Sequence, residues 1–81
     1  MRVTLRAVSD LSRHFGADEL QVAFDGATVR DLVRHLKSRY GYDLASDKYT
    51  LLFLNGRGCV EYGARLQEGD GIALIPLIAA G

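Results

Sequence analysis

The sequence predicts a single α+β domain in which one main helix packs against a mixed sheet of four to five strands. Three observations support this prediction. The 81 residues suffice for one hydrophobic core but not for two. Several short segments alternate between polar and apolar residues, and one longer segment has the apolar spacing of an amphipathic helix. The hydrophobic share of 48% excludes a chain that stays disordered for lack of apolar surface.

The first two strands are predicted near the N-terminus. Residues 2–8 alternate polar and apolar side chains, and residues 19–24 do so again, which is typical of half-buried strands. Between them, Ser9 and Asp10 are favourable N-cap residues for a short helical turn. Gly16 ends this turn, so the two strands are joined by a short irregular connection.

The main helix is predicted from Thr28 to the residue before Gly41. Thr28 and Asp31 have the spacing of a capping box, and Gly41 suits the left-handed conformation that ends a helix. The apolar residues of this segment follow helical spacing and form one buried face: Val29, Leu32, Val33, Leu36 and Tyr40.

The second half of the chain predicts the remaining strands. Residues 49–54 are rich in aromatic and aliphatic side chains, and Asn55-Gly56 then favours a reversal because both residues tolerate positive φ. Residues 58–62 are predicted to return as a short strand. Residues 72–75 form a buried strand that ends at Pro76, which has no N–H to donate to a sheet.

The composition argues against several classes of protein. Ten Lys and Arg balance ten Asp and Glu, which disfavours a nucleic-acid binder. A single cysteine allows neither an intrachain disulfide nor a cysteine-rich zinc site. The longest apolar stretch, 72–80, is far shorter than a membrane span, and we see no secretory signal. We therefore expect a cytoplasmic protein without nucleic-acid or membrane partners.

No residues in the sequence assemble into a catalytic or metal site. Glycine-rich phosphate loops, nucleophile elbows and zinc-protease helix patterns are absent from it. His14 and His35 are interpreted as surface residues rather than metal ligands, and Cys59 as a small packed residue rather than a reactive thiol. A basic helix stripe could dock an acidic partner, but a solvated face is favoured: Arg30, Arg34 and Lys37.

The C-terminus carries the strongest functional signal. We expect residues 1–76 to form the domain and residues 77–81 to form a flexible tail, which can extend about 17 Å. Its residues are small and uncharged, and it ends in Gly81, whose carboxylate no Cβ shields. The tail is either a frayed end or a segment that enters the active site of another protein.

These features resemble the ubiquitin-like sulfur carriers, which include the molybdopterin synthase small subunit and its thiazole-synthesis relative. The residues that carry the resemblance are the run 54–57, the run 66–76 with its Gly69-Asp70 and Pro76, and the short tail that ends in glycine. The resemblance spans nearly the whole chain, and the length is closer to the molybdopterin member. It implies a β-grasp (ubiquitin-like) fold, in agreement with the predicted order of elements.

The resemblance also implies a function and its partners. A ubiquitin-activating-like adenylyltransferase would use ATP in trans to adenylylate Gly81, and a persulfide sulfur would then displace AMP to leave a thiocarboxylate. The partner-binding tail would be Leu77, Ile78, Ala79 and Ala80, inserted into the molybdopterin synthase large subunit. The chain would bind no cofactor and would have no catalytic residue besides Gly81. The candidates for an apolar docking patch, each of which could instead belong to the core, are Leu52, Leu54, Ile75 and Leu77.

The sequence departs from the family pattern at Ala80, where the family has glycine, and at Leu77, where the molybdopterin members often have proline. Either a partner accepts the Cβ of Ala80, or the mature terminus lies elsewhere. Three other functions therefore stay open. The chain could be a non-catalytic binding or accessory subunit with an inert Gly81, a sulfur carrier for thiazole or amino-acid synthesis, or a modifier conjugated to protein lysines.

Overall fold

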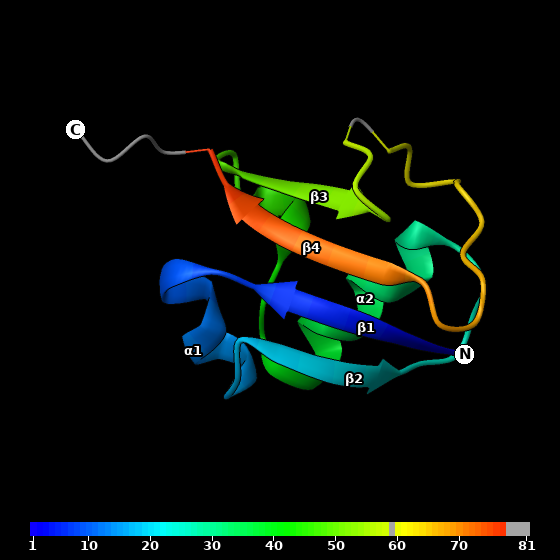
Figure 1. Ribbon diagram of the computed structural model, residues 1–81, viewed down its shortest axis with the longest axis horizontal. Coiled ribbons are helices and arrows are strands. Elements are labelled where there is room, and N and C mark those ends of the chain that lie inside the picture. The colour runs from blue at the N-terminus through cyan, green and yellow to red at the C-terminus, as the bar shows by residue number, and fades with distance from the viewer. Residues whose placement is uncertain (59, 78–81) are drawn as a thin grey trace.

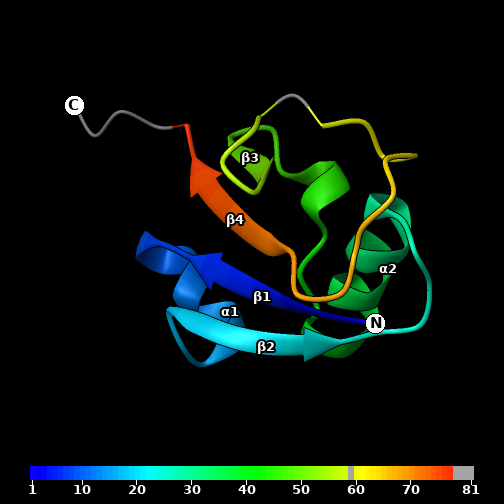
Figure 2. The same cartoon turned by 45° about the vertical axis from the view of Figure 1, so that its right-hand side comes forward.

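The computed structural model describes residues 1–58 and 60–77, which form a four-stranded sheet with one long helix across one face (Figures 1 and 2). The strands are β1 (Arg2–Ala7), β2 (Glu19–Ala23), β3 (Thr50–Leu54) and β4 (Gly71–Pro76). Their order across the sheet is β2-β1-β4-β3. The pair β1–β4 is parallel, and the pairs β1–β2 and β3–β4 are antiparallel. The prediction of an α+β domain with a mixed sheet is confirmed.

The long helix α2 (Val29–Tyr40) has the predicted caps at both ends. At its start, the Thr28 hydroxyl accepts the Asp31 N–H at 3.3 Å, and the Asp31 carboxylate accepts the Thr28 N–H at 3.2 Å. The carboxylate also accepts the Ala27 N–H at 2.9 Å, and these bonds lower the pKa of Asp31. At its end, Gly41 has φ 71°, so the left-handed stop is confirmed.

The short connection between β1 and β2 is helical, but it begins differently from the prediction. A 3₁₀ turn, η1 (Ser9–Leu11), leads directly into α1 (Ser12–Phe15). The residue before α1 is therefore Leu11, which makes no side-chain cap, because the preceding turn already holds helical backbone. Gly16 ends α1 with φ 77°, as predicted.

The core lies between α2 and the sheet. Each strand sends alternate side chains toward the helix, and α2 returns its predicted apolar face, apart from the half-buried Tyr40. The most deeply buried of these side chains are Val3, Leu5, Val22, Val29, Leu32, Leu36, Ile72 and Leu74.

The predicted short strand at 58–62 is wrong for its described residues. After Leu54 the chain makes a tight turn in which Asn55 has φ 50° and Gly56 has φ 85°. The segment beyond then runs to the start of α2, where the carbonyls of Ala64 and Tyr62 accept the first N–H groups of the helix at 3.0 and 2.8 Å. This segment satisfies a helix end instead of pairing with β3. Within the loop before β3 lies a further 3₁₀ turn, η2 (Leu44–Ser46).

Candidate functional site

None of the helices in residues 1–58 and 60–77 covers the face of the sheet opposite α2. Figure 1 looks onto this open face, with α2 behind the strands. In β1, Val3 and Leu5 point to the core, whereas Thr4 and Arg6 lie on the open face. In β4, the residues on the open face are Gly71, Ala73 and Ile75, whose side chains grow in size along the strand.

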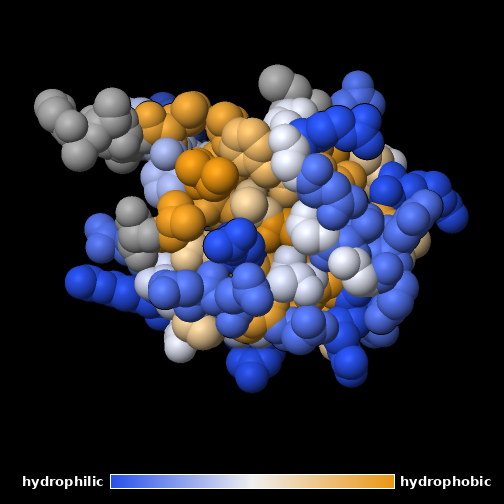
Figure 3. Space-filling view, viewed as in Figure 1, coloured by the Kyte–Doolittle hydropathy of each residue, from blue (hydrophilic) through white to orange (hydrophobic). Residues whose placement is uncertain are grey.

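The open face changes from polar to apolar toward the end of the sheet from which the tail departs. Strand register arranges its residues in three rows, which are Gln21–Thr4–Gly71, Glu19–Arg6–Ala73–Phe53, and Ile75–Leu51. Figure 3 shows this face, and its hydrophobic area lies over β3 and the end of β4. The large hydrophobic residues that are exposed in the described chain are Val8, Tyr49, Leu51, Ile75 and Leu77. We call Tyr49, Leu51, Ile75 and Leu77 the apolar end of the open face.

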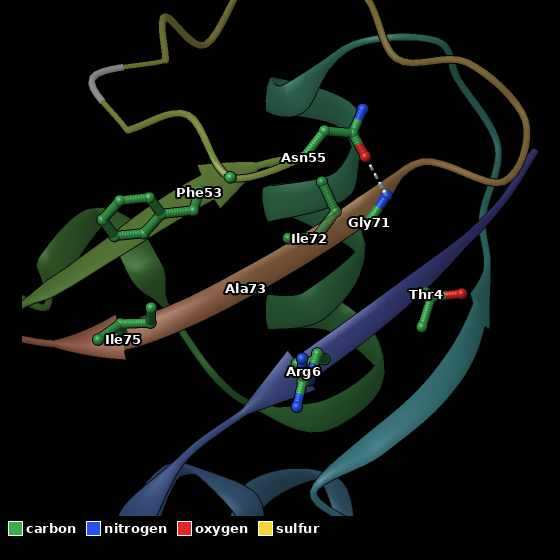
Figure 4. A pocket seen from close by; sticks show the side chains of 9 residues that line it. Thr4, Arg6, Phe53, Asn55, Gly71, Ile72, Ala73 and Ile75 are labelled. Carbon is green, nitrogen blue, oxygen red and sulfur yellow. Dashed lines mark hydrogen bonds between the residues drawn. The ribbon is translucent and has the colours of Figure 1, made fainter.

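A shallow hollow of about 440 Å³ lies in the middle of the open face (Figure 4). It exists because Gly71 has no side chain and Ala73 has a small one, so the larger side chains on either side project further from the sheet. Its lining comprises Thr4, Arg6, Phe53, Asn55, Gly56, Gly71, Ile72, Ala73 and Ile75. An open, largely apolar hollow of this kind suits a side chain of a partner protein better than a free small molecule, which binding sites usually enclose.

Charge at this hollow comes from Arg6, whose guanidinium pairs with Glu19 at 3.4 Å on the neighbouring strand. Both side chains are well exposed, so the pair contributes little to stability. Its effect is to place one cation and one anion at the edge of an apolar surface, where they can influence which partner binds.

The tail begins directly from the sheet. The β3–β4 ladder reaches the pair Thr50–Pro76, and the Leu77 N–H then donates to the Tyr49 carbonyl. Leu77 is 58% exposed and continues the apolar end of the open face. The predicted tail residues Ile78, Ala79, Ala80 and Gly81 lie outside the described residues, as does Cys59.

The structure exposes two of the four residues named as candidates for an apolar docking patch. Ile75 and Leu77 are exposed, but Leu54 belongs to the core and Leu52 is half-buried against it. Leu51 and Phe53, which the prediction missed, lie on the open face instead. Every residue of β3 from 51 to 54 is apolar, so alternation could not show which side faces outward, although pairing of Leu51 with Ile75 decides it.

The ionisable groups with shifted pKa values serve the fold. The hydroxyls of Thr50 and Tyr42 donate to Asp47 and lower its pKa, and burial raises the pKa of Tyr42 to about 12. The ring of His14 lies 5.3 Å from the ring of Tyr42, and that of His35 lies 6.2 Å from Phe24. Within residues 1–58 and 60–77, no three His, Cys, Asp or Glu side chains are placed to hold a metal ion.

The basic stripe on α2 is exposed, as the solvated interpretation expects. Arg34 lies 4.0 Å from Asp31, and Lys37 lies 3.7 Å from Asp43, so two of its three cations have acidic neighbours on the chain itself. Among the helices that the structure describes, none is long and apolar enough to cross a membrane.

Comparison with protein families decides the identity of this fold. Residues 8–81 match the sequence model of the ThiS family, and the match includes the tail. The chain belongs to the ThiS family of ubiquitin-like sulfur carriers. The resemblance noted in the sequence is thereby confirmed, and the β-grasp assignment with it. No curated protein matches the chain in sequence.

Solved structures of similar fold include several carriers and modifiers. SAMP1 from Haloferax volcanii aligns with a TM-score of 0.79 at 24% identity, over 100% of both chains. A putative molybdopterin converting factor subunit 1 from Pyrococcus furiosus aligns with a TM-score of 0.77 at 26% identity, over 96% of this chain and 99% of that one. A chain of the BexX/CysO complex from Amycolatopsis orientalis aligns with a TM-score of 0.75 at 24% identity, over 98% of this ThiS-family chain and 99% of its own.

Proposed function

We propose that this ThiS-family chain carries sulfur as a thiocarboxylate on Gly81. A ubiquitin-activating-like adenylyltransferase uses ATP to convert the Gly81 carboxylate to an acyl-adenylate with release of pyrophosphate. A persulfide sulfur displaces AMP to give an acyl disulfide, and a thiol then attacks the outer sulfur, which forms a new disulfide and releases the thiocarboxylate. The chain binds no cofactor of its own in this scheme, because the nucleotide is held by the partner.

The observation that carries this proposal is that the family match extends through the tail to Gly81. Two features of the described residues support it. The apolar end of the open face surrounds the point where the tail departs, and contiguous exposed apolar surface usually marks an interface. The hollow beside it, with Arg6 at its edge, gives the partner a shaped surface to recognise.

Within this function, we propose molybdopterin synthesis as the destination of the sulfur and the molybdopterin synthase large subunit as the receiving partner, in the cytoplasm. The likeness to a putative molybdopterin converting factor subunit 1, at 26% identity and over nearly the full length of both chains, supports this assignment. The tail would insert Leu77, Ile78, Ala79 and Ala80 into the large subunit, which supplies the catalytic groups.

The test is the intact mass of the protein after incubation with adenylyltransferase, ATP, a persulfide donor and a thiol reductant. We expect a gain equal to the replacement of one oxygen by one sulfur, and fragmentation should locate it on Gly81. A variant that lacks Gly81 is the matched control and should gain nothing. An unmodified mass with every partner tried, while the same partners load a ThiS-family relative, would refute sulfur carriage.

Ala80 favours a second candidate, a binding subunit that is never loaded. A Cβ at the penultimate position restricts the backbone and narrows the fit to a channel shaped for glycine. In this case Gly81 is inert, and the open face alone provides the function. The same mass experiment separates the two, because a binding subunit would form a stable complex with its partner without any change in mass.

A further inference from the structure

The part of the loop that joins β3 is organised by the carboxylate of Asp47. Its Oδ2 accepts the Thr50 hydroxyl at 2.7 Å and the Tyr42 hydroxyl at 2.8 Å, and its Oδ1 accepts the Tyr49 N–H at 3.1 Å. Thr50 and Tyr42 are both largely buried, so two of these donors have little access to water. Asp47 therefore fixes the backbone at the first residues of β3.

The register of β3 with β4 shows what the bond to Tyr49 displaces. The register of this antiparallel pair places Asn55 opposite Gly71, and the two form a hydrogen-bonded pair through the Asn55 N–H. Hydrogen-bonded pairs then recur at every second residue, and the last of them is Tyr49 with Leu77. Such a pair normally has two bonds. The Leu77 N–H does donate to the Tyr49 carbonyl, but the Tyr49 N–H donates to Asp47 instead of the Leu77 carbonyl.

The other end of the same ladder has an equivalent arrangement. The Asn55 N–H donates to the Gly71 carbonyl at 2.8 Å, but the Gly71 N–H donates to the Asn55 side-chain Oδ1 at 2.8 Å rather than to its backbone carbonyl. Figure 4 shows this bond. A side-chain oxygen thus takes the last N–H at each end, which stops the ladder at a defined residue.

We propose that Asp47 is a positioning residue that ends the β3–β4 ladder at Leu77 and so sets where the tail begins. By occupying the Tyr49 N–H, it leaves the Leu77 carbonyl without that backbone partner among the described residues. It also withholds the bond that would pair the tail further along β3. Each further residue drawn into the ladder would shorten the reach of Gly81 by about 3.4 Å. The effect of this ladder end on the loading of Gly81 with sulfur rests on the proposed sulfur-carrier function, whereas the hydrogen bonding of Asp47 does not depend on that function.

The structural test is NMR of the full chain, using scalar couplings across hydrogen bonds. In the unmodified protein we expect a coupling from the Tyr49 amide nitrogen to the side-chain carboxyl carbon of Asp47 and none to the Leu77 carbonyl carbon. In Asp47→Ala, the coupling should move to the Leu77 carbonyl, and the Tyr49 amide should remain protected from exchange. A coupling to Leu77 in the unmodified protein would overturn the proposal whether or not the variant folds.

Two further variants separate positioning from general loosening of the loop. Asp47→Asn keeps an acceptor oxygen for the Tyr49 N–H, so it should retain the original bond. Asp43 is the matched control, because it also accepts a backbone N–H two residues on, from Ala45 at 3.1 Å, while its other polar partners are Ser46 and Lys37 rather than residues of β3 or β4. Asp43→Ala should therefore leave the Tyr49 coupling unchanged. Loss of that coupling in Asp43→Ala would overturn the specific role of Asp47.

The functional test measures adenylylation of the same variants by the adenylyltransferase. We expect Asp47→Ala to lower kcat by about tenfold with KM nearly unchanged, because the docking face is intact and only the delivery of the carboxylate is altered. Asp47→Asn should restore most of the rate, and Asp43→Ala should match the unmodified chain. If the couplings move as expected but kcat does not, the positioning role is overturned and sulfur carriage stands. If even the unmodified chain is not adenylylated, the proposed function fails, while the couplings still decide whether Asp47 ends the ladder.

Discussion

Ile75→Asp is the sharpest test of the open face as the docking surface. Ile75 lies at the apolar end of that face, pairs with Leu51 across the ladder, and lines the hollow. A carboxylate at this position would be carried into any apolar contact that a partner makes there, and desolvating it without a cation is unfavourable. The substitution should therefore weaken partner binding far more than it weakens the fold.

The expected loss of folding stability follows from the exposed fraction of Ile75. Ile75 is 39% exposed, so about three fifths of its surface is buried, and losing that burial costs about 1–2 kcal/mol. The lower strand propensity of aspartate adds up to about 1 kcal/mol. A domain of 81 residues has about 4–12 kcal/mol of stability, so we expect the variant to stay folded at room temperature. Loss of a central interface contact costs about 2 kcal/mol or more, which is about a 30-fold weaker Kd.

The assay is calorimetric titration of the adenylyltransferase with each variant, together with thermal unfolding of the variant alone. Gln21→Asp is the matched control, since Gln21 lies on the same face at its polar end, beside Thr4. We expect its Kd to remain within twofold of the unmodified value. A folded Ile75→Asp protein that binds as tightly as the unmodified chain would refute the open face as the docking surface.

Three further predictions concern stability and the tail. The pKa of Asp47 is lowered in the folded state, so its ionised carboxylate stabilises the fold fully above the ordinary value of 3.8, and this stabilisation is lost as pH falls through the folded pKa. The midpoint of urea unfolding should therefore drop in acid, and it should drop less in Asp47→Asn. Gly26 has φ 129°, and a Cβ there would collide with the Asp31 side chain, so Gly26→Ala should lower the free energy of unfolding by about 2 kcal/mol or more. In the same urea unfolding assay Gly63→Ala should be nearly neutral, because a Cβ at Gly63 meets open space. Ala80→Gly restores the penultimate glycine of the family pattern and should raise the rate of partner-dependent adenylylation severalfold; an unchanged rate would show that the partner accepts the Cβ.

Local chemistry explains which parts of the fold could be predicted from the sequence. Thr28 and Asp31 satisfy each other within one helical turn, and Gly41 and Asn55-Gly56 adopt positive φ for reasons contained in their own backbone. Such features need no information from distant residues. The strand predicted at 58–62 was wrong because the chain there leads to carbonyls, those of Tyr62 and Ala64, that bond to N–H groups of α2 about thirty residues earlier, and no local pattern identifies such partners.

Long-range pairing also explains what was missed at the candidate site. Leu51, Phe53 and Ile75 share a face only because β3 pairs with β4 in one register, and a shift by one residue would have exposed Leu52 and Leu54 instead. The role of Asp47 depends on Tyr42 and Thr50, which are ordinary residues in the sequence and become its donors only when the loop closes over the core.

The sequence of β4 links the core, the docking face and the tail in one continuous segment. Alternate residues of the strand, Ile72 and Leu74, anchor it in the core, while Ala73 and Ile75 form part of the open face. A partner that contacts Ile75 would therefore bind a strand that is held in place by the packing of Ile72 and Leu74 in the core. Gly81 lies six positions after Ile75, so the carboxylate of Gly81 in the proposed carrier lies at most about 20–22 Å from that contact. For the proposed sulfur carrier, docking and delivery are therefore one geometric problem: the partner would have to place its active site within this radius of the surface that binds the open face.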